Sequence, residues 1–182
     1  MRKILLLTLA MILIVLPLTG CLGAETITAP PGAIPLADMP PAPEGLVHPI
    51  PEGFGVVSSN ESESLLSNGM HTIFVRYAIA PNASAVINTA ITDGIDSFAE
   101  QYIKSIAGEL EITTFSFFGQ NAVMLNAILS ESTEHGRAGN AAIYAIAPYG
   151  DYFVMIAAYA QASEREILRE KISAFMNDFT QE

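Results

Sequence analysis

The sequence predicts an α+β domain, in which an antiparallel sheet of about five to seven strands carries a long helix after its first hairpin and a second helix at the C-terminus. Three observations predict this class. An Asn68-Gly69 pair joins two apolar runs as in a β-hairpin. Strand-like runs joined by turns too short for a crossover must be antiparallel neighbours. Two further stretches place apolar residues at the spacing of one helical face.

The N-terminus is typical of an exported protein. Arg2 and Lys3 precede an apolar run, Ile4 to Leu16, which only Thr8 interrupts. The run is shorter than the roughly 20 residues that a membrane-spanning helix needs, and it matches the apolar region of a secretory signal peptide. We therefore expect residues 1–20 to be a signal peptide that is removed.

The next residues, Leu18-Thr19-Gly20-Cys21, contain the only cysteine of the chain and resemble the lipobox of prokaryotic lipoproteins. The resemblance implies that a diacylglyceryl group, with acyl chains such as palmitate, is attached to the sulfur of Cys21, which becomes the first residue after cleavage. Two acyl chains anchor a protein stably, whereas one gives marginal binding. We expect a lipid anchor in the cell membrane, with the protein facing outside the cytoplasm. The alternative is an ordinary secretory signal followed by an incidental cysteine.

Residues 21–52 have the composition of a tether. Eight of the eleven prolines of the chain lie between Pro30 and Pro51. Proline favours an extended conformation, so such a stretch acts as a semi-rigid spacer. We expect residues 21–52 to hold the domain away from the membrane, with the open alternative that its end, Leu46 to Phe54, packs onto the domain as an edge segment.

Residues 53–182 are expected to form a single domain that begins with strands. Phe54 to Ser59 has the composition of a first strand, and the hairpin at Asn68-Gly69 leads into a second long run, Met70 to Ala80. One face of that run is apolar, namely Ile73, Val75, Tyr77 and Ile79.

A helix is predicted next, from Asn82 or Ser84 to about Gly108, with Gly94 inside it. Its apolar face consists of Ile91, Ile95, Phe98, Tyr102 and Ile106. Three or four strands then follow, within residues 110–118, 122–131, 137–147 and 152–159. The last two are apolar on both faces, which predicts that both faces are covered.

The closing helix is predicted to begin at Ser163, because Glu166 three residues later completes a capping box. Its buried stripe is Leu168, Ile172, Phe175, Met176 and Phe179.

The pattern as a whole resembles the PsbP/Mog1-like α/β fold over about residues 51–180. The features that carry the resemblance are the Pro51-Glu52-Gly53-Phe54 opening, the hairpin, the long helix, the strands with Gly119 and Ala122, and the closing helix. The resemblance implies a non-enzymatic accessory or binding domain. It supplies no catalytic motif that can be carried over to a residue of this chain.

Composition excludes nucleic acid as a partner. The formal net charge is −11, and lysines and arginines form no cluster that could displace counterions from phosphates. An acidic surface also disfavours adhesion to anionic headgroups, so membrane attachment has to come from lipid.

No catalytic residue, metal site or cofactor is predicted. The sequence has neither a Gly-x-Ser-x-Gly elbow nor a glycine-rich phosphate loop. Two groups of side chains have a spacing that could attract a cation, although a solvated surface is the favoured interpretation of both: Glu131 with Glu134 and His135, and Asp93 with Asp96 and Glu100.

Two other patterns remain open. Asn60-Glu61-Ser62 and Asn82-Ala83-Ser84 match the acceptor pattern for N-glycosylation, which makes Asn60 and Asn82 candidate sites. Three aromatic side chains beside a predicted turn could line a ligand pocket, although core packing is favoured: Phe115, Phe117 and Phe118.

The sequence therefore predicts a membrane-tethered, extracytoplasmic lipoprotein that is not an enzyme. Its domain is expected to act as a binding or accessory module for a membrane or surface complex, whose protein component the sequence does not identify. One alternative is a carrier of a small ligand or lipid, with a cavity between sheet and helix. The other is a hydrolase whose nucleophile, base and oxyanion donor converge only in the folded chain.

Overall fold

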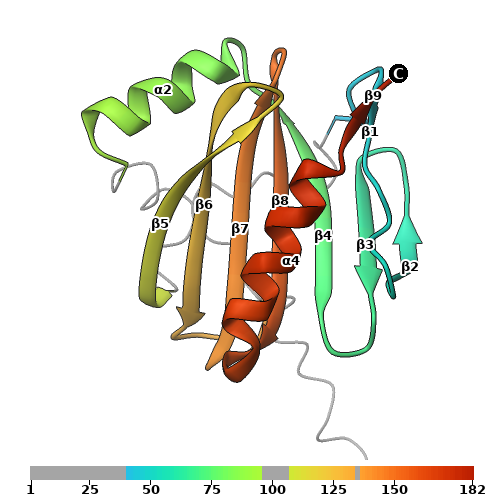
Figure 1. Cartoon of the computed structure of the whole chain (residues 1–182), viewed down its shortest axis with the longest axis vertical. Helices are drawn as coiled ribbons and strands as arrows, with labels where there is room; N and C mark the ends of the chain where they lie inside the picture. Colours follow the sequence, from blue (N-terminus) through green and yellow to red (C-terminus); the bar gives the residue numbers. More distant parts are fainter. Residues whose placement is uncertain (1–39, 96–106, 134–135) are drawn as a thin grey trace, which may run out of the picture.

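The computed structural model describes residues 40–95, 107–133 and 136–182 (Figure 1). The predicted signal peptide, Cys21 and the tether up to residue 39 lie outside the described residues.

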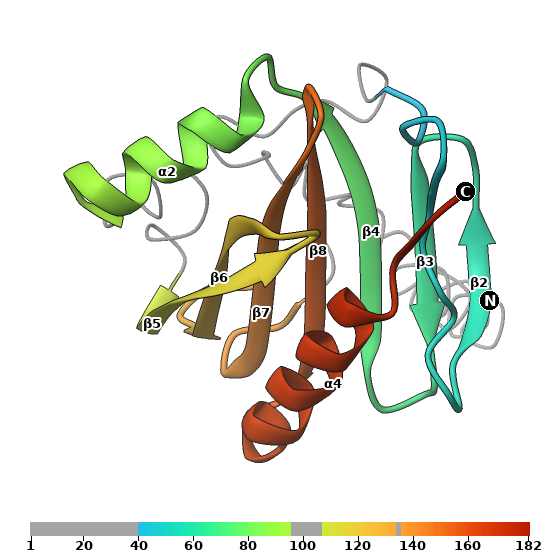
Figure 2. The ribbon, with the colours of Figure 1, turned by 45° about the horizontal axis from the view of Figure 1, so that its top comes forward.

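Seven strands form one antiparallel sheet, in the order β2-β3-β4-β8-β7-β6-β5. Their bounds are β2 Gly55–Ser59, β3 Glu63–Ser67, β4 Thr72–Ile79, β5 Ala107–Phe117, β6 Gln120–Leu129, β7 Asn140–Tyr149 and β8 Tyr152–Gln161. Two helices cover the sheet, namely α2, Ala83–Asp93, and α4, Arg165–Asn177 (Figures 1 and 2). This arrangement confirms the predicted α+β class, with a helix after the first hairpin and a helix near the C-terminus.

The first hairpin, β3–β4, turns where the sequence predicts it, but through different chemistry. Asn-Gly pairs commonly form two-residue turns in which both residues have positive φ. Here only Gly69 does, with φ 86°. The side-chain oxygen of Asn68 instead accepts the backbone N–H groups of Met70 and His71, at 3.0 and 2.7 Å. The turn is therefore a wider loop that an asparagine side chain closes.

Helix α4 packs over β7 and β8 and encloses the larger core. Its buried residues are Leu168, Ile172, Phe175 and Met176, which confirms the predicted stripe, and Phe179 is buried just beyond the helix. They pack on side chains that alternate along the strands, such as Ile73, Val75 and Tyr77 of β4. The fourth residue of that predicted face, Ile79, is exposed at the end of its strand.

The start of α4 differs from the predicted capping box. Ser163 lies in a 3₁₀ turn, Ala162–Glu164, and the helix begins at Arg165 without a side-chain cap. Arg165 fixes this end of the helix to the sheet instead. Its Nε donates to Oδ1 of the buried Asn126 at 2.9 Å, and its guanidinium also bonds the backbone oxygen of Asn126. A tertiary contact thus replaces the local cap.

Helix α2 lies on the opposite face, over β6 and β7. It buries Ala83 and Ile87 against a second core. The prediction of a helix continuing to Gly108 is wrong at Gly94, which ends the helix with φ 122°, a conformation outside the helical region. Of the predicted apolar face, Ile91 and Ile95 pack partly buried against the second core, and the remaining residues lie outside the described residues.

Asn82 precedes α2 in the left-handed conformation, with φ 58°, and makes no side-chain cap. Its backbone N–H donates to Oδ1 of Asp151 at 3.0 Å. Strands β7 and β8, between the two cores, are buried along most of their length, which confirms that both their faces are covered.

The end of the proline-rich segment lies against the domain. Strand β1, Leu46–Val47, pairs with β9, Thr180–Gln181, at the extreme C-terminus. Leu46 is buried in the larger core, and the backbone N–H of Ala42 donates to the oxygen of Glu61 at 2.7 Å. The chain from Ala42 to His48 therefore forms a wall across one corner of the sheet.

Candidate functional site

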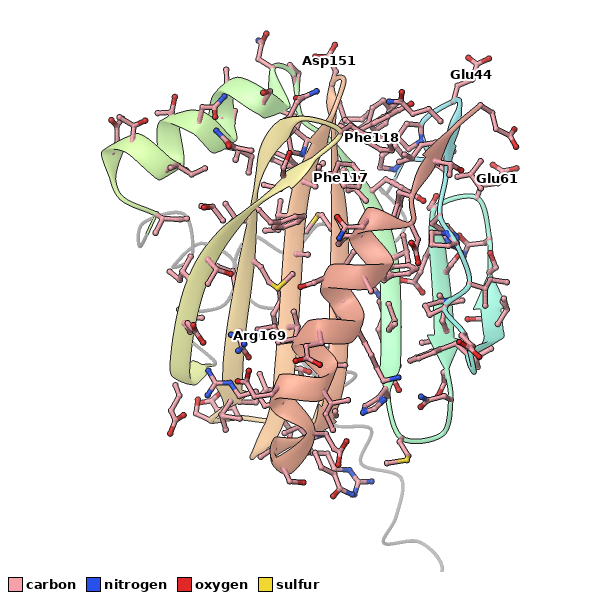
Figure 3. The ribbon with its side chains drawn as sticks, in the orientation of Figure 1. Glu44, Glu61, Phe117, Phe118, Asp151 and Arg169 are labelled. Atoms are coloured by element: carbon pink, nitrogen blue, oxygen red, sulfur yellow. The ribbon has the colours of Figure 1, made fainter. Side chains whose placement is uncertain are left out.

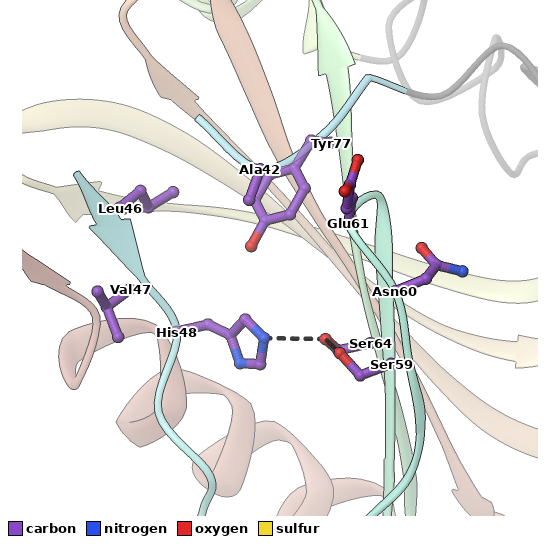
Figure 4. A pocket seen from close by; sticks show the side chains of 9 residues that line it. All are labelled: Ala42, Leu46, Val47, His48, Ser59, Asn60, Glu61, Ser64 and Tyr77. Atoms are coloured by element: carbon purple, nitrogen blue, oxygen red, sulfur yellow. Dashed lines mark hydrogen bonds between the residues drawn. The ribbon is translucent and has the colours of Figure 1, made fainter. Parts of the chain in front are cut away.

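A hollow of about 210 Å³ lies between this wall and the β2–β3 hairpin (Figure 4). We call it the Tyr77 pocket. Its lining residues are Ala42, Leu46, Val47, His48, Ser59, Asn60, Glu61, Ser64 and Tyr77. Most of the polar lining residues belong to the β2–β3 hairpin, whereas His48 belongs to the wall formed by Ala42 to His48. The pocket exists because the wall crosses the core face of β3 and β4 near the C-terminal end of β4.

Strand alternation puts polar side chains where core residues are expected. Along β3, Ser64 and Leu66 are both buried on the face that carries the larger core. Ser64 on β3 lies opposite Val75 on the neighbouring strand β4. Tyr77, two residues after Val75, lies on the same face of β4. Leu66, Val75 and Tyr77 belong to the larger core, whereas Ser64 and Tyr77 line the pocket beside the wall. The result is a polar corner next to an apolar core.

One chain of hydrogen bonds crosses this corner. His48 Nδ1 lies 3.1 Å from the carbonyl oxygen of Pro49, which can only accept, so Nδ1 carries the proton. Its Nε2 lies 3.0 Å from the hydroxyl oxygen of Ser64, within hydrogen-bond distance. The hydroxyl oxygens of Ser64 and Ser59 are 2.9 Å apart and share a second hydrogen bond. The three side chains therefore form one connected group.

The hydroxyl of Tyr77 takes no part in these hydrogen bonds. Tyr77 is 3% exposed, and its buried hydroxyl has no hydrogen-bond partner within the part of the chain that the structure describes. Figure 4 shows the hydroxyl turned into the pocket, between the wall and the hairpin. Burial raises the pKa of Tyr77 to about 12, so the phenol keeps its proton at physiological pH. A buried hydroxyl left unpaired costs about 1–3 kcal/mol.

The rim of the pocket is held by a turn. Oδ1 of Asn60 accepts the backbone N–H groups of Ser62 and Glu63, at 2.8 and 2.9 Å. Glu63 forms an ion pair with Arg76 on β4. These contacts fix the loop that presents the exposed Glu61, the only formally charged side chain in the pocket lining.

The Ser64–His48 pair has the contact of a nucleophile with its base. One feature sets it apart from a catalytic triad. The third group is the Pro49 carbonyl, which carries no negative charge to stabilise a protonated imidazole, whereas triads place a carboxylate there.

A second polar cluster surrounds His71, at the other end of β4. Asn68 Nδ2 donates to Nδ1 of His71 at 3.3 Å, and the ring stacks on Phe54. Its Nε2 lies 3.7 Å from Oε2 of Glu164, which is too long for a hydrogen bond. Burial, reinforced by the charge of Lys171, lowers the pKa of His71 below its ordinary value. We interpret this cluster as a structural contact between the β3–β4 turn and the turn before α4.

The candidate glycosylation sites occupy different settings. Asn60 is exposed at the rim of the Tyr77 pocket, with its side-chain oxygen already used in the turn. Asn82 is exposed at the start of α2.

The two candidate cation groups are not assembled within the described ranges. Glu131 and Asp93 are exposed, and their predicted companions lie outside the described residues: Glu134, His135, Asp96 and Glu100. No group of three or more potential metal ligands occurs in residues 40–95, 107–133 and 136–182. Cys21 also lies outside these ranges.

The three aromatic residues beside the β5–β6 turn are divided between core and surface. Phe117 is buried, and Phe115 is packed partly buried against the larger core. Phe118 is exposed at the tip of the hairpin (Figure 3), with φ 47°. Its ring lies against that of Tyr149. These residues form no pocket together, which agrees with the favoured interpretation of core packing for two of them.

Sequence reasoning missed the pocket. The sequence places His48 in the predicted tether and Tyr77 on the apolar face of the run from Met70 to Ala80, and it assigns no role to Ser64. One signal was available: Ser64 alternates in phase with Leu66, so a hydroxyl occupies a position that an apolar side chain normally takes.

Comparison with known proteins gives a likeness of fold and nothing more specific. No family model matches the sequence. No curated protein matches it either. The solution structure of cyanobacterial PsbP (CyanoP) from Synechocystis sp. PCC 6803 has a TM-score of 0.48 and 8% identity, over 76% of this chain and 87% of that chain. The crystal structure of LpqN, involved in cell envelope biogenesis of Mycobacterium tuberculosis, has a TM-score of 0.49 and 13% identity, over 74% and 82%.

A PsbP protein is thus among the structural neighbours, as the sequence pattern suggests. Both TM-scores are below 0.5, so the neighbours' roles carry no weight for this chain. Within the described residues, no helix is long and apolar enough to cross a membrane.

Proposed function

We propose that this protein is a lipid-anchored, extracytoplasmic binding module that holds a small polar ligand in the Tyr77 pocket and catalyses no reaction. The observation that carries the proposal is the Tyr77 hydroxyl, which is buried, neutral and unpaired while it faces a hollow. Folding tends to satisfy buried polar groups, and an unsatisfied one at a pocket is explained when a ligand completes it.

The pocket also suits a protein on a tether. Its wall is the end of the proline-rich segment, so ligand contacts and the attachment to the membrane share the same stretch, from Ala42 to His48. A ligand between wall and hairpin would bridge two segments that only a few polar contacts join. Binding there would therefore strengthen the docking of the tether end onto the domain.

The binding proposal is tested without knowing the ligand. The chain is extracted from native membranes in mild detergent, and its intact mass is measured under non-denaturing conditions. We expect wild-type protein to carry a small-molecule adduct that is absent from Tyr77→Phe and retained by Tyr144→Phe, a half-buried tyrosine outside the pocket lining. Equal spectra for wild type and Tyr77→Phe would contradict a ligand at this hydroxyl.

The anchor is tested separately. We expect wild-type protein to remain with the membrane fraction and to have the mass of a chain that begins at a diacylated Cys21. Cys21→Ser should leave the protein in the soluble fraction or with its first residues uncleaved. An unmodified thiol on membrane-extracted protein would contradict the lipid anchor and leave the pocket proposal untouched.

A second candidate function, docking on a membrane or surface protein, is favoured by the edge strand β2. One side of β2 pairs with β3, and within the described sheet its other side has no neighbour. Val56 and Val57 on this strand are 50% and 63% exposed. An edge strand with exposed valines is a site to which another chain can add a strand. Photo-crosslinking from position 57 in intact cells should capture a protein that position 131 does not.

A further inference from the structure

We propose that the wall is a releasable strap, which detaches from the domain as a unit, opens the Tyr77 pocket and lengthens the tether. The opening of the pocket to a ligand rests on the proposed binding function, whereas the detachment of the wall does not. Three features of the described residues support the proposal: the wall forms one side of the pocket, it is attached at few places, and it lies outside the main sheet.

The wall separates two buried side chains of the pocket from solvent. Ser64 on β3 and Tyr77 on β4 line the pocket and are 5% and 3% exposed. The side chains of Leu46, Val47 and His48 line it from the wall (Figure 4). Because so little of Ser64 and Tyr77 is exposed while the wall is docked, a ligand reaches them once the wall has moved. The wall therefore acts as the gate of the pocket.

Backbone hydrogen bonds attach the wall at its start and at β1. The N–H of Ala42 donates to the oxygen of Glu61 at 2.7 Å. Further along, β1 pairs with β9, and the N–H of Glu182 donates to the oxygen of Gly45 at 2.9 Å. Strands β1 and β9 form a two-stranded sheet of their own, and both residues of β9 are exposed. A short, exposed pairing of this kind opens locally more readily than the strands of a large sheet.

Side chains add one apolar contact and one polar contact to this attachment. Leu46 is 6% exposed and belongs to the larger core, whereas its neighbour Val47 is 39% exposed. The Nε2 atom of His48 lies 3.0 Å from the hydroxyl oxygen of Ser64. Burial of apolar surface is the main force that holds a segment against a domain. We therefore expect Leu46 to control how often the wall is released.

The wall can leave while the seven-stranded sheet stays folded, because neither β1 nor β9 belongs to that sheet. Residues 49–53 link the wall to β2, and Ile50, Glu52 and Gly53 in this link are exposed. On its other side the wall continues into the segment that we expect to be the tether. Release would add residues 40–53 to the tether and extend its reach by at most about 50 Å.

Cysteine labelling measures the release of the wall. Ser64→Cys places a thiol in the pocket, and Val154→Cys places one on β8, where Val154 is fully buried in the larger core. Each variant of the full chain is extracted in mild detergent and treated with iodoacetamide. The parent protein, whose only cysteine is Cys21, gives the background. We expect Ser64→Cys to react at least about tenfold faster than Val154→Cys, because release of the wall exposes the first thiol without unfolding the domain.

Three substitutions separate release of the wall from unfolding of the domain. Leu46→Ala removes the buried side chain of β1 and should accelerate labelling of Ser64→Cys by about tenfold or more. Val47→Ala, on the exposed side of the same strand, should change it by less than about twofold. Ile172→Ala weakens the core under α4, which stays folded when the wall leaves. It should therefore accelerate Val154→Cys and leave Ser64→Cys unchanged.

Amide exchange in the wild-type chain repeats the comparison without a new thiol. The amides of Ala42 and Leu46 should exchange at a rate that hardly changes in low concentrations of urea, because release of the wall exposes little surface. The amides of β8 should exchange at a rate that rises steeply with urea, because they are freed only when the domain unfolds.

Equal labelling rates for Ser64→Cys and Val154→Cys, both accelerated by Ile172→Ala, would overturn the inference, since the wall would then open only with the whole domain. Fast labelling of Ser64→Cys that Leu46→Ala leaves unchanged would overturn it too, because the reagent would then pass a docked wall. The binding function is judged separately, by the adduct that depends on Tyr77. An adduct without separate release of the wall leaves the binding function standing, and separate release without an adduct leaves the strap alone.

Discussion

His71 Nε2 lies 3.7 Å from the Oε2 atom of Glu164, where the start of the second β-hairpin strand meets the turn before α4. The imidazole is buried, and its other nitrogen accepts from Asn68. The neutral ring suits this site, because burial disfavours the charged form more than Glu164 favours it.

Stability should therefore fall as the solution becomes acidic. The pKa of His71 is lowered in the folded chain from the ordinary 6.5 of the unfolded chain, so the unfolded chain takes up the proton first. The contribution of His71 is complete above 6.5 and is lost as the pH falls through the folded-state pKa. We expect the free energy of unfolding, measured by urea denaturation, to decrease as the pH is lowered through 6.5 and below.

His71→Gln is the control for that measurement. It removes the titrating group while retaining a polar side chain, and the other ionisable groups remain. The loss of stability on acidification should be smaller in His71→Gln than in wild type. Equal losses in both proteins would show that His71 does not titrate in this range.

Tyr77→Phe should stabilise the protein in the absence of ligand. The substitution removes a buried hydroxyl without a partner, which relieves about 1 kcal/mol or more. Tyr144→Phe is the matched control, since the hydroxyl of Tyr144 bonds that of Tyr159 at 3.0 Å, and its removal should cost about 1 kcal/mol. Chemical denaturation of both variants tests these two opposite changes in the free energy of unfolding. A Tyr77→Phe protein less stable than wild type would mean that the hydroxyl has a structural partner.

Gly136→Ala should destabilise the fold by about 1–3 kcal/mol through overpacking. A Cβ atom at this position would lie 2.5 Å from Cδ1 of Tyr159 and 2.6 Å from Cδ1 of Leu129. Both neighbours are buried and belong to one cluster, so they have little room to move. Gly55→Ala is the comparison, because there the nearest atom is at 4.0 Å, and its midpoint of thermal unfolding should stay close to wild type. A Gly136→Ala protein as stable as Gly55→Ala would contradict this packing.

The two faces of α4 should respond differently to the same substitution. Ile172→Ala removes a fully buried side chain from the larger core and should cost about 2–5 kcal/mol. Ile167→Ala, on the exposed side of the same helix, should change stability by less than about 0.5 kcal/mol. Urea midpoints that fell equally in both variants would contradict the orientation of the helix.

Local patterns predicted much of the fold correctly. Apolar residues at helical spacing located α4 and its buried stripe, because a helix has only one way to bury Leu168, Ile172 and Phe175 together. Short turns fixed the antiparallel order of β5 to β8. The ends of the helices were less predictable. Gly94 ends α2 because its backbone leaves the helical region, and Arg165 holds the start of α4 through a hydrogen bond to Asn126, which is far away along the chain.

The sequence by itself thus determined the antiparallel α+β architecture, through periodicity and turn chemistry that act between near neighbours. Only the tertiary structure decided the candidate site. His48 and Ser64 are sixteen positions apart, and they meet because β1 pairs with β9 at the other end of the chain and lays the wall over β3 and β4. Tyr77 has the pattern of a core residue, and it becomes a candidate binding group only because the wall forms a pocket that Tyr77 helps to line, while its buried hydroxyl has no partner among the described residues.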